Sequence, residues 1–292
     1  MQQAQNLFPI TLKDHFIQCK KNGQSLLEAV TSYEVTEDQV NALSYSTESQ
    51  SQSQEWFDHR ELRMTSSIIH DVVQFYKCTK SRTKAKLKDA LVDKILMNQV
   101  QVSPAVKRAM EYGLRNESKA RSLYELKLSD HLHLAVQVPG MKINVQSPFL
   151  SASLDGIVNC ACHNGTSVLE IKCPYFSTDR GIAQMIARGR YIVDIDGNIN
   201  PEHRYYTQIQ FQMAVTGYEK AVLAVYLKNR IQEPLFGEMA RRKRKPMPRS
   251  PNPADQVWTL AIPRDYEFGE HLLKLGKQFL LDHVYPMYYE QL

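Results

Sequence analysis

Two short stretches of this 292-residue chain carry charged residues inside otherwise apolar runs. In "LEIK", Leu169–Lys172, apolar and charged residues alternate, so Glu170 and Lys172 share one face of a strand. Asp155 stands in "SLDG", near the end of the preceding apolar run. If the two runs pair as a hairpin, Asp155 and Glu170 face each other at roughly 5 Å between Cβ atoms.

Two carboxylates and a lysine in this arrangement suit the metal-assisted hydrolysis of a phosphodiester. Carboxylates that close repel one another unless a cation separates them, and oxygen-rich acidic pockets bind Mg²⁺ or Mn²⁺. Lys172 would hold or deprotonate the attacking water. Two metal ions about 4 Å apart supply a nucleophile, relieve the phosphate charge and stabilise the leaving oxygen. The pattern therefore predicts a hydrolytic site rather than a solvent-facing strand.

Each residue also has a purely structural explanation. Asp155 before Gly156 is typical of a turn. Glu170 and Lys172 would then form a surface ion pair worth under about 1 kcal/mol. Glu117 lies in the middle of a predicted helix, where an acid is usually exposed to solvent. The hydrolytic interpretation fails only if all of these explanations hold together.

Helices are predicted before these strands. Apolar residues recur at helical spacing over 66–76, 84–97 and 104–126, and the last of these begins at Pro104, which suits a first helical turn. The period then changes to two in "FLSASLDGIVN" and "SVLEIKC", which are separated by an Asn-Gly turn signal and predict a hairpin.

After the hairpin the chain alternates between helix and strand. We expect helices over 180–188 and 202–216, strands at "AVLAVYL" and "VWTLAIP", and a C-terminal helix of about 25 residues. The Arg/Lys/Pro-rich segment 237–255 is expected to be a loop between these two strands. This order predicts an α/β fold with a mixed central β-sheet flanked by helices.

A boundary is expected near residue 50. Thr36 and Gln39 form a capping-box signature for a helix, and the polar, low-complexity segment 44–54 is typical of a linker. We therefore expect residues 1–50 to form a helical N-terminal extension with a polar linker, and residues 51–292 to form the catalytic domain.

Composition points to an intracellular globular protein. Hydrophobic residues make up 43% of the chain and charged residues 23%, and neither a membrane-length apolar run nor a secretory signal is visible. The five cysteines are too sparse for a disulfide framework. Cys160, Cys162 and His163 lack a second nearby pair of ligands, so we predict no zinc site, and Cys173 is expected to be a small buried residue.

Positive charge is concentrated in two runs. The net charge is +5, and the segments 77–88 and 241–245 are dense in Lys and Arg without an acid. Such runs favour a polyanionic partner, although a solvated surface explains them equally well. The second run, "RRKRK", resembles a nuclear localisation signal and would direct the protein to the nucleus of a eukaryotic host.

Five ordered segments extend the pattern well beyond one short motif: "WFDHRELRMTSS", "AMEYGLRNESKARSLYE", "SASLDGIV", "LEIKCP" and "YYTQIQFQM". In order and approximate spacing they resemble the lambda-exonuclease or YqaJ-like viral recombinase family of the PD-(D/E)XK nuclease superfamily, which is related to viral alkaline nucleases. The resemblance covers about residues 55–227. It implies the PD-(D/E)XK (restriction-endonuclease-like) fold and a nuclease that uses two Mg²⁺ ions per site, with Mn²⁺ as an alternative.

The resemblance also implies a set of metal ligands. Asp155 would bridge the two ions, and Glu117, Glu170 and the main-chain carbonyl of Ile171 would complete the set. Leu154 stands where the family commonly has a proline. We expect this departure to alter the entry of the strand and to leave the aspartate in place.

Further roles follow from the same resemblance. Lys172 would position and activate the attacking water, and Gln208 would support it. Arg60, Ser67 and Ser153 would bind the 5′ phosphate of the substrate.

The implied activity is 5′-to-3′ exonucleolytic cleavage of linear double-stranded DNA during recombination or DNA-end processing. A single-strand annealing or binding protein is a conceivable partner, an oligomer is allowed, and no membrane is expected. Two alternatives remain: an endonuclease or RNA-cleaving nuclease using the same site, and a non-catalytic nucleic-acid-binding module on a nuclease scaffold. The acids favour an enzyme, because without metal they would repel a phosphate.

Overall fold

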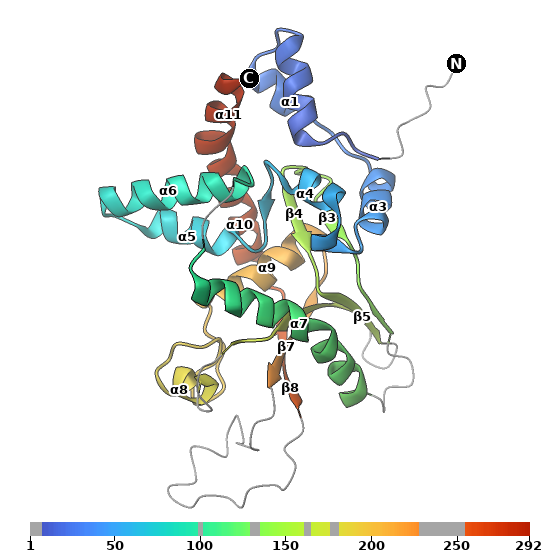
Figure 1. Ribbon diagram of the computed structural model, residues 1–292, viewed down its shortest axis with the longest axis vertical. Coiled ribbons are helices and arrows are strands. Elements are labelled where there is room, and N and C mark those ends of the chain that lie inside the picture. Colours follow the sequence, from blue (N-terminus) through green and yellow to red (C-terminus); the bar gives the residue numbers. More distant parts are fainter. Residues whose placement is uncertain (1–7, 99–101, 129–134, 161–164, 176–180, 228–254) are drawn as a thin grey trace, which may run out of the picture.

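Two β-sheets form the centre of the protein in the computed structural model, which describes residues 8–98, 102–128, 135–160, 165–175, 181–227 and 255–292 (Figure 1). Within these ranges the smaller sheet has the order β1-β4-β3 and the larger the order β2-β5-β6-β7-β8. The strands are β1 (Met64–Thr65), β2 (Ala135–Gln137), β3 (Met141–Ile143), β4 (Leu150–Ser153), β5 (Gly156–Cys160), β6 (Gly165–Lys172), β7 (Lys220–Leu227) and β8 (Gln256–Pro263).

The larger sheet is mixed, as predicted. Strands β5 and β6 pair antiparallel, with Gly156 opposite Leu169, which confirms the expected hairpin and its register. Strand β7 runs parallel to β6 and antiparallel to β8. The crossover from β6 to β7 includes α8 (Gly181–Ala187) and α9 (Arg204–Thr216).

The larger sheet is covered by helices on both faces. Helix α7 (Pro104–Lys127) packs on one face, where Ala120 and Tyr124 join a buried cluster with Leu169 and Ile171. Helix α9 packs on the other face, where Ile209 belongs to the main core. Because β6 is covered on both sides, Glu170 is buried and Lys172 is only partly exposed.

The run predicted as one strand over 149–159 is in fact two strands. Strand β4 ends at Ser153 in the smaller sheet, and β5 begins at Gly156 in the larger one. The break has a physical cause: Gln50 donates from Nε2 to the carbonyl of Leu154 at 2.8 Å, and the Asp155 carboxylate accepts a hydrogen bond from the main chain of β6. These side-chain bonds replace ladder hydrogen bonds at the point where the chain changes sheet.

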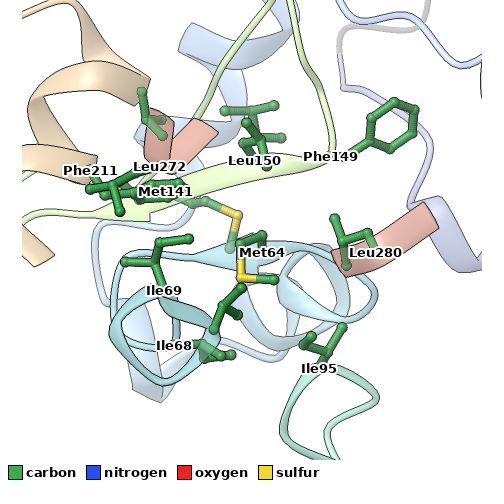
Figure 2. Packing of buried hydrophobic residues seen from close by; sticks show 14 of the residues in the cluster. Met64, Ile68, Ile69, Ile95, Met141, Phe149, Leu150, Phe211, Leu272 and Leu280 are labelled. Atoms are coloured by element: carbon green, nitrogen blue, oxygen red, sulfur yellow. The ribbon is translucent and has the colours of Figure 1, made fainter. Parts of the chain in front are cut away.

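The main core lies where the smaller sheet meets the helices. Figure 2 shows Met64 of β1 surrounded by side chains from several elements, including Ile69, Met141 and Leu150. The helices around it are α5 (Ile69–Lys77), α6 (Ser81–Ile95) and α10 (Tyr266–Phe279). A π-helical turn (Leu280–Val284) joins α10 to α11 (Tyr285–Gln291), so the predicted long C-terminal helix is present with one irregular turn.

Residues 8–60 include α1 (Leu12–Lys21), α2 (Leu26–Thr31), α3 (Glu37–Ser46), a 3₁₀ turn (Gln50–Gln52) and α4 (Gln54–Arg60). The expected capping box of Thr36 and Gln39 is formed at the start of α3. Helix α1 packs on α11, where the Phe16 ring lies 5.0 Å from that of Tyr285 (Figure 1). In the segment expected to be a linker, Thr47 is fully buried. The division at residue 50 remains a prediction, and the segment around it is packed against the rest of the protein.

Several sequence predictions concern residues outside the described ranges. These are Cys162 and His163, and the basic run Arg241–Lys245 with most of its loop.

Candidate active site

A cavity of about 290 Å³ lies where α7, the start of β5, the end of β6 and the N-terminal part of α9 meet. The elements that carry its lining residues are close together in the ribbon (Figure 1). Glu117 comes from α7, Asp155 from the loop before β5, and Gln208 from α9. The full lining is Gly113, Glu117, Asp155, Glu170, Ile171, Lys172, Cys173, Pro174, Tyr205 and Gln208. All of the predicted metal and catalytic residues therefore line one cavity.

Glu170 is the most enclosed of the three acids, with 1% of its surface exposed. Its Oε1 accepts hydrogen bonds from Lys172 Nζ and from Gln208 Nε2, the latter at 2.6 Å. Its Oε2 accepts from Gln212 Nε2 at 2.6 Å. A buried carboxylate is costly unless it is paired and hydrogen-bonded, and these three donors meet that requirement.

Asp155 lies opposite Glu170, one step beyond the last paired residues of the β5–β6 ladder. Its Oδ2 accepts a hydrogen bond from the main-chain N–H of Ile171 at 2.6 Å, which fixes the side chain toward β6. Burial is the main reason that the pKa of Asp155 lies well above its usual value, and the neighbouring Glu170 carboxylate raises it further. The two predicted carboxylates do converge.

Glu117 reaches the cavity from α7 and is held by an arginine one turn later. Arg121 Nη2 donates to Glu117 Oε1 at 2.8 Å. The same guanidinium donates from Nε and Nη2 to the main-chain carbonyl of Asp155, at 3.2 and 3.0 Å. Arg121 thus ties the helix that carries one acid to the loop that carries another.

Lys172 lies between acids and an aromatic ring. Its Nζ donates to Glu170 and to Gln208 Oε1, the latter at 3.1 Å, and lies 5.3 Å from the centre of the Tyr205 ring. Burial by itself would lower the pKa of Lys172, but attraction to Glu170 and Asp155 outweighs it, so the pKa is raised. An ammonium group has three donors, so one remains for a water or a phosphate oxygen.

The donors around the cavity match the chemistry of a hard divalent cation. Three carboxylates line it, and a cation there would offset both the burial of Asp155 and its repulsion by Glu170, the two causes of its raised pKa. Across the described residues, however, no three His, Cys, Asp or Glu side chains lie in an arrangement that would hold a metal ion. Glu117 is engaged by Arg121, and Glu170 by three donors. The ligand set and the two-ion count therefore remain predictions.

The predicted phosphate-binding residues form a second cluster, which we call the phosphate cluster, where the end of α4, the segment between β1 and α5, and the end of β4 meet. Arg60 Nη2 donates to Ser67 Oγ at 2.7 Å and to Thr65 Oγ1 at 3.3 Å. Its guanidinium lies 4.5 Å from the Trp56 ring, and the Trp56 indole donates to Ser153 Oγ at 2.9 Å. The structure thus brings Arg60 and Ser67 into direct contact and connects Ser153 to them through Trp56.

Sequence reasoning missed several residues that the structure places in these clusters. Gln212 binds Glu170, Arg121 binds Glu117, and Trp56 stacks on Arg60. Each of the three stands four residues from a predicted site residue on the same helix, and residues at that spacing are neighbours on a helix surface. The i,i+4 positions around each predicted residue were the available signal.

No helix within the described ranges is both long and apolar enough to span a membrane.

Among solved structures, the alkaline exonuclease LHK-Exo from Laribacter hongkongensis is similar to this chain at 21% identity. Its TM-score is 0.52, and the match covers 82% of this chain and 95% of that chain. The LHK-Exo complex with dAMP gives 22% identity, a TM-score of 0.53 and the same coverage. At this identity the likeness establishes a shared fold, which is the lambda-exonuclease-like PD-(D/E)XK fold.

Other comparisons give weaker matches. The Shutoff and Exonuclease Protein of the Kaposi's sarcoma associated herpesvirus matches at 13% identity with a TM-score of 0.48, covering 92% of this chain and 79% of that chain. None of the curated proteins matches this chain.

The family comparison covers the whole of both clusters. The YqaJ-like viral recombinase domain matches residues 55–219, which is more than half of the chain and includes every predicted site residue from Arg60 to Gln208. The chain therefore belongs to the YqaJ-like viral recombinase domain family.

Proposed function

We propose that this protein is a divalent-metal-dependent deoxyribonuclease that degrades linear duplex DNA from a 5′ end. The observation that carries the proposal is the convergence of Glu117, Asp155, Glu170 and Lys172 on one cavity. Family membership supports it, as does the fold shared with an alkaline exonuclease whose structure was solved with dAMP.

The protein's own residues would divide the work as follows. Glu117, Asp155, Glu170 and the carbonyl of Ile171 would hold Mg²⁺ or Mn²⁺. When bound, such ions supply a reactive water at neutral pH and neutralise charge on the phosphate. Lys172, oriented by Glu170 and Gln208, would direct its remaining N–H to the attacking water or to a phosphate oxygen.

The direction of degradation rests on the second cluster. Arg60, Ser67 and Ser153 offer donors to an anion, and a guanidinium forms strong charge-assisted hydrogen bonds with a phosphate. Ser153 lies two residues before Asp155, and its main-chain carbonyl accepts from the same Gln212 amide that binds Glu170. A terminal phosphate bound there would place the first phosphodiester of that strand near the cavity. The nuclease would then start from 5′ ends.

The test uses Asp155→Asn and Lys172→Gln with end-labelled linear, nicked and circular duplexes in Mg²⁺. We expect both variants to lose cleavage while they retain duplex binding, because each change removes chemistry and leaves the basic surface intact. Lys220→Gln is the matched control, since Lys220 is an exposed lysine at the start of the neighbouring strand β7. Turnover by either site variant at saturating Mg²⁺ would refute the assigned site.

The product pattern separates the alternatives. Loss of terminal nucleotides from linear duplex alone supports an exonuclease, and cutting of circular duplex indicates an endonuclease. Cleavage of a matched RNA duplex at a comparable rate would indicate a nuclease that does not select DNA. Binding without any Mg²⁺-dependent cleavage would identify a non-catalytic module.

A further inference from the structure

Gln212 is fully buried on α9, directly behind the carboxylate of Glu170. Its Nε2 donates to Glu170 Oε2 at 2.6 Å and to the main-chain carbonyl of Ser153 at 3.3 Å. One amide therefore bridges β6, which carries an acid of the cavity, and β4, which carries a residue of the phosphate cluster.

The other end of the same side chain has no hydrogen-bond partner among the described residues. Gln212 Oε1 is buried, and no donor in the described part of the chain reaches it. A buried acceptor left without a hydrogen bond lowers stability, so such a group calls for an explanation beyond folding. Turning the amide over would leave its oxygen facing two acceptors, Glu170 Oε2 and the Ser153 carbonyl. The orientation is therefore set by the carboxylate.

Gln210 shows what a purely structural glutamine looks like on the same helix. It is also fully buried, but its Nε2 donates to the carbonyl of Pro263 at 2.8 Å and its Oε1 accepts from the N–H of Asp265 at 2.8 Å. Both ends of Gln210 are satisfied, and both bonds join α9 to the end of β8 and the start of α10. Its contacts lie away from the cavity.

The two oxygens of Glu170 have different partners. Oε1 is held by Lys172 and Gln208, both of which line the cavity. Oε2 is held by Gln212, which does not line it. The terminal torsion of a glutamate is soft, so a donor on each oxygen is needed to fix the plane of the carboxylate.

We propose that Gln212 is a positioning residue that fixes the carboxylate of Glu170 for divalent-cation binding. The inference rests on the proposed function, because it takes Glu170 as a metal ligand. Hydrogen bonds behind a ligand orient it toward the ion, and their loss typically weakens metal binding about 10- to 100-fold. Among the described residues Gln212 is the donor to Oε2, and this would make Glu170 depend on Gln212 in this way.

The experiment is calorimetric titration of the whole protein with Mn²⁺ alone, without nucleic acid. We expect Gln212→Leu to weaken Mn²⁺ binding about 10- to 100-fold. The matched control is Gln210→Leu, which removes an equally buried glutamine two residues away. Gln210→Leu should lower the melting temperature, because the carbonyl of Pro263 and the N–H of Asp265 lose their hydrogen-bond partners. The affinity of this control for Mn²⁺ should stay within about threefold of that of the wild type.

A second readout distinguishes positioning from general damage. Gln212→Met keeps the length of the side chain, and this variant is used instead of Gln212→Leu if circular dichroism shows that Gln212→Leu does not fold. In cleavage assays, the folded Gln212 variant should have a lower kcat and an unchanged KM for the duplex, because the DNA-binding surface is intact.

Three results would overturn the inference. The first is equal Mn²⁺ affinity in the wild type and the Gln212 variants, and the second is an equal loss of affinity in the Gln210 and Gln212 variants. The third is a change confined to KM. Failure of the proposed function has a different signature, because the wild type itself would then bind no Mn²⁺.

Discussion

We predict that Arg60 makes the nuclease prefer duplexes with a 5′ phosphate. Arg60 Nη2 lies 2.7 Å from Ser67 Oγ, and the guanidinium lies 4.5 Å from the Trp56 ring, so its fork is already oriented before any substrate binds. Burial lowers the pKa of Arg60 to about 10, so the group stays protonated at neutral pH. A terminal phosphate would meet a fixed positive charge.

The size of the effect follows from the loss of one charged hydrogen-bonded contact. Such a contact is worth about 1.5 to 3 kcal/mol. Because each 1.36 kcal/mol is a factor of ten in rate, Arg60→Ala should slow degradation of 5′-phosphorylated duplex on the order of ten- to a hundredfold. Arg60→Lys keeps the charge and loses the planar fork, so it should fall between the wild type and Arg60→Ala.

The assay compares duplexes of identical sequence, labelled at the 3′ end, that differ only in a 5′ phosphate or a 5′ hydroxyl. We expect the wild type to prefer the phosphorylated end and Arg60→Ala to lose that preference by slowing that substrate alone. The hydroxyl duplex serves as the internal control for folding. Equal rates on both ends in the wild type, or equal slowing of both by Arg60→Ala, would refute the phosphate pocket and favour an endonuclease.

Three further outcomes are expected. Burial lowers the pKa of His59 to about 4, so between pH 6.5 and 4 the unfolded state binds a proton that the folded state does not. The free energy of unfolding, measured in urea, should therefore fall by up to about 3 kcal/mol as the pH is lowered from 6.5 to 4. The fall should be smaller in His59→Gln. An alanine at Gly140 would place its Cβ against Thr47 and Ser44, so Gly140→Ala should cost about 1 to 3 kcal/mol or more in thermal unfolding. Neutral replacement of Arg241–Lys245 should remove a tagged protein from the nucleus of a eukaryotic host, whereas unchanged localisation with weaker duplex binding would indicate a DNA contact.

Local signals in the sequence were enough for the main elements. The capping box at Thr36 and Gln39 and the proline at position 104 each fix a helix start through hydrogen bonds or backbone angles within a few residues. The alternation around Glu170 set the face of β6, and the hairpin that pairs it with β5 formed in the expected register. These features depend on neighbours in the chain, so the sequence alone was sufficient to predict them.

The change of sheet at Leu154 and Asp155 depended on distant residues. The run from 149 to 159 was predicted as one continuous strand, although Asp155 before Gly156 is typical of a turn and marks the point where the chain changes sheet. The break is stabilised by Gln50, about a hundred positions earlier, and by the main chain of Ile171. Side-chain hydrogen bonds between segments so far apart leave no periodic signal.

The sequence predicted which side chains would converge, Asp155, Glu170 and Lys172 from their spacing and Glu117 from the family resemblance, and all four line one cavity. Tertiary structure alone decided how they are held. Helix α9 is covered on both sides, so Gln210 and Gln212 are equally buried and hydropathy cannot separate them. What separates them is their partners, since one glutamine meets the end of β8 and the other meets a buried carboxylate. The i,i+4 spacing makes Gln212 a neighbour of Gln208 on the helix surface, but only packing between distant segments brings both side chains to Glu170.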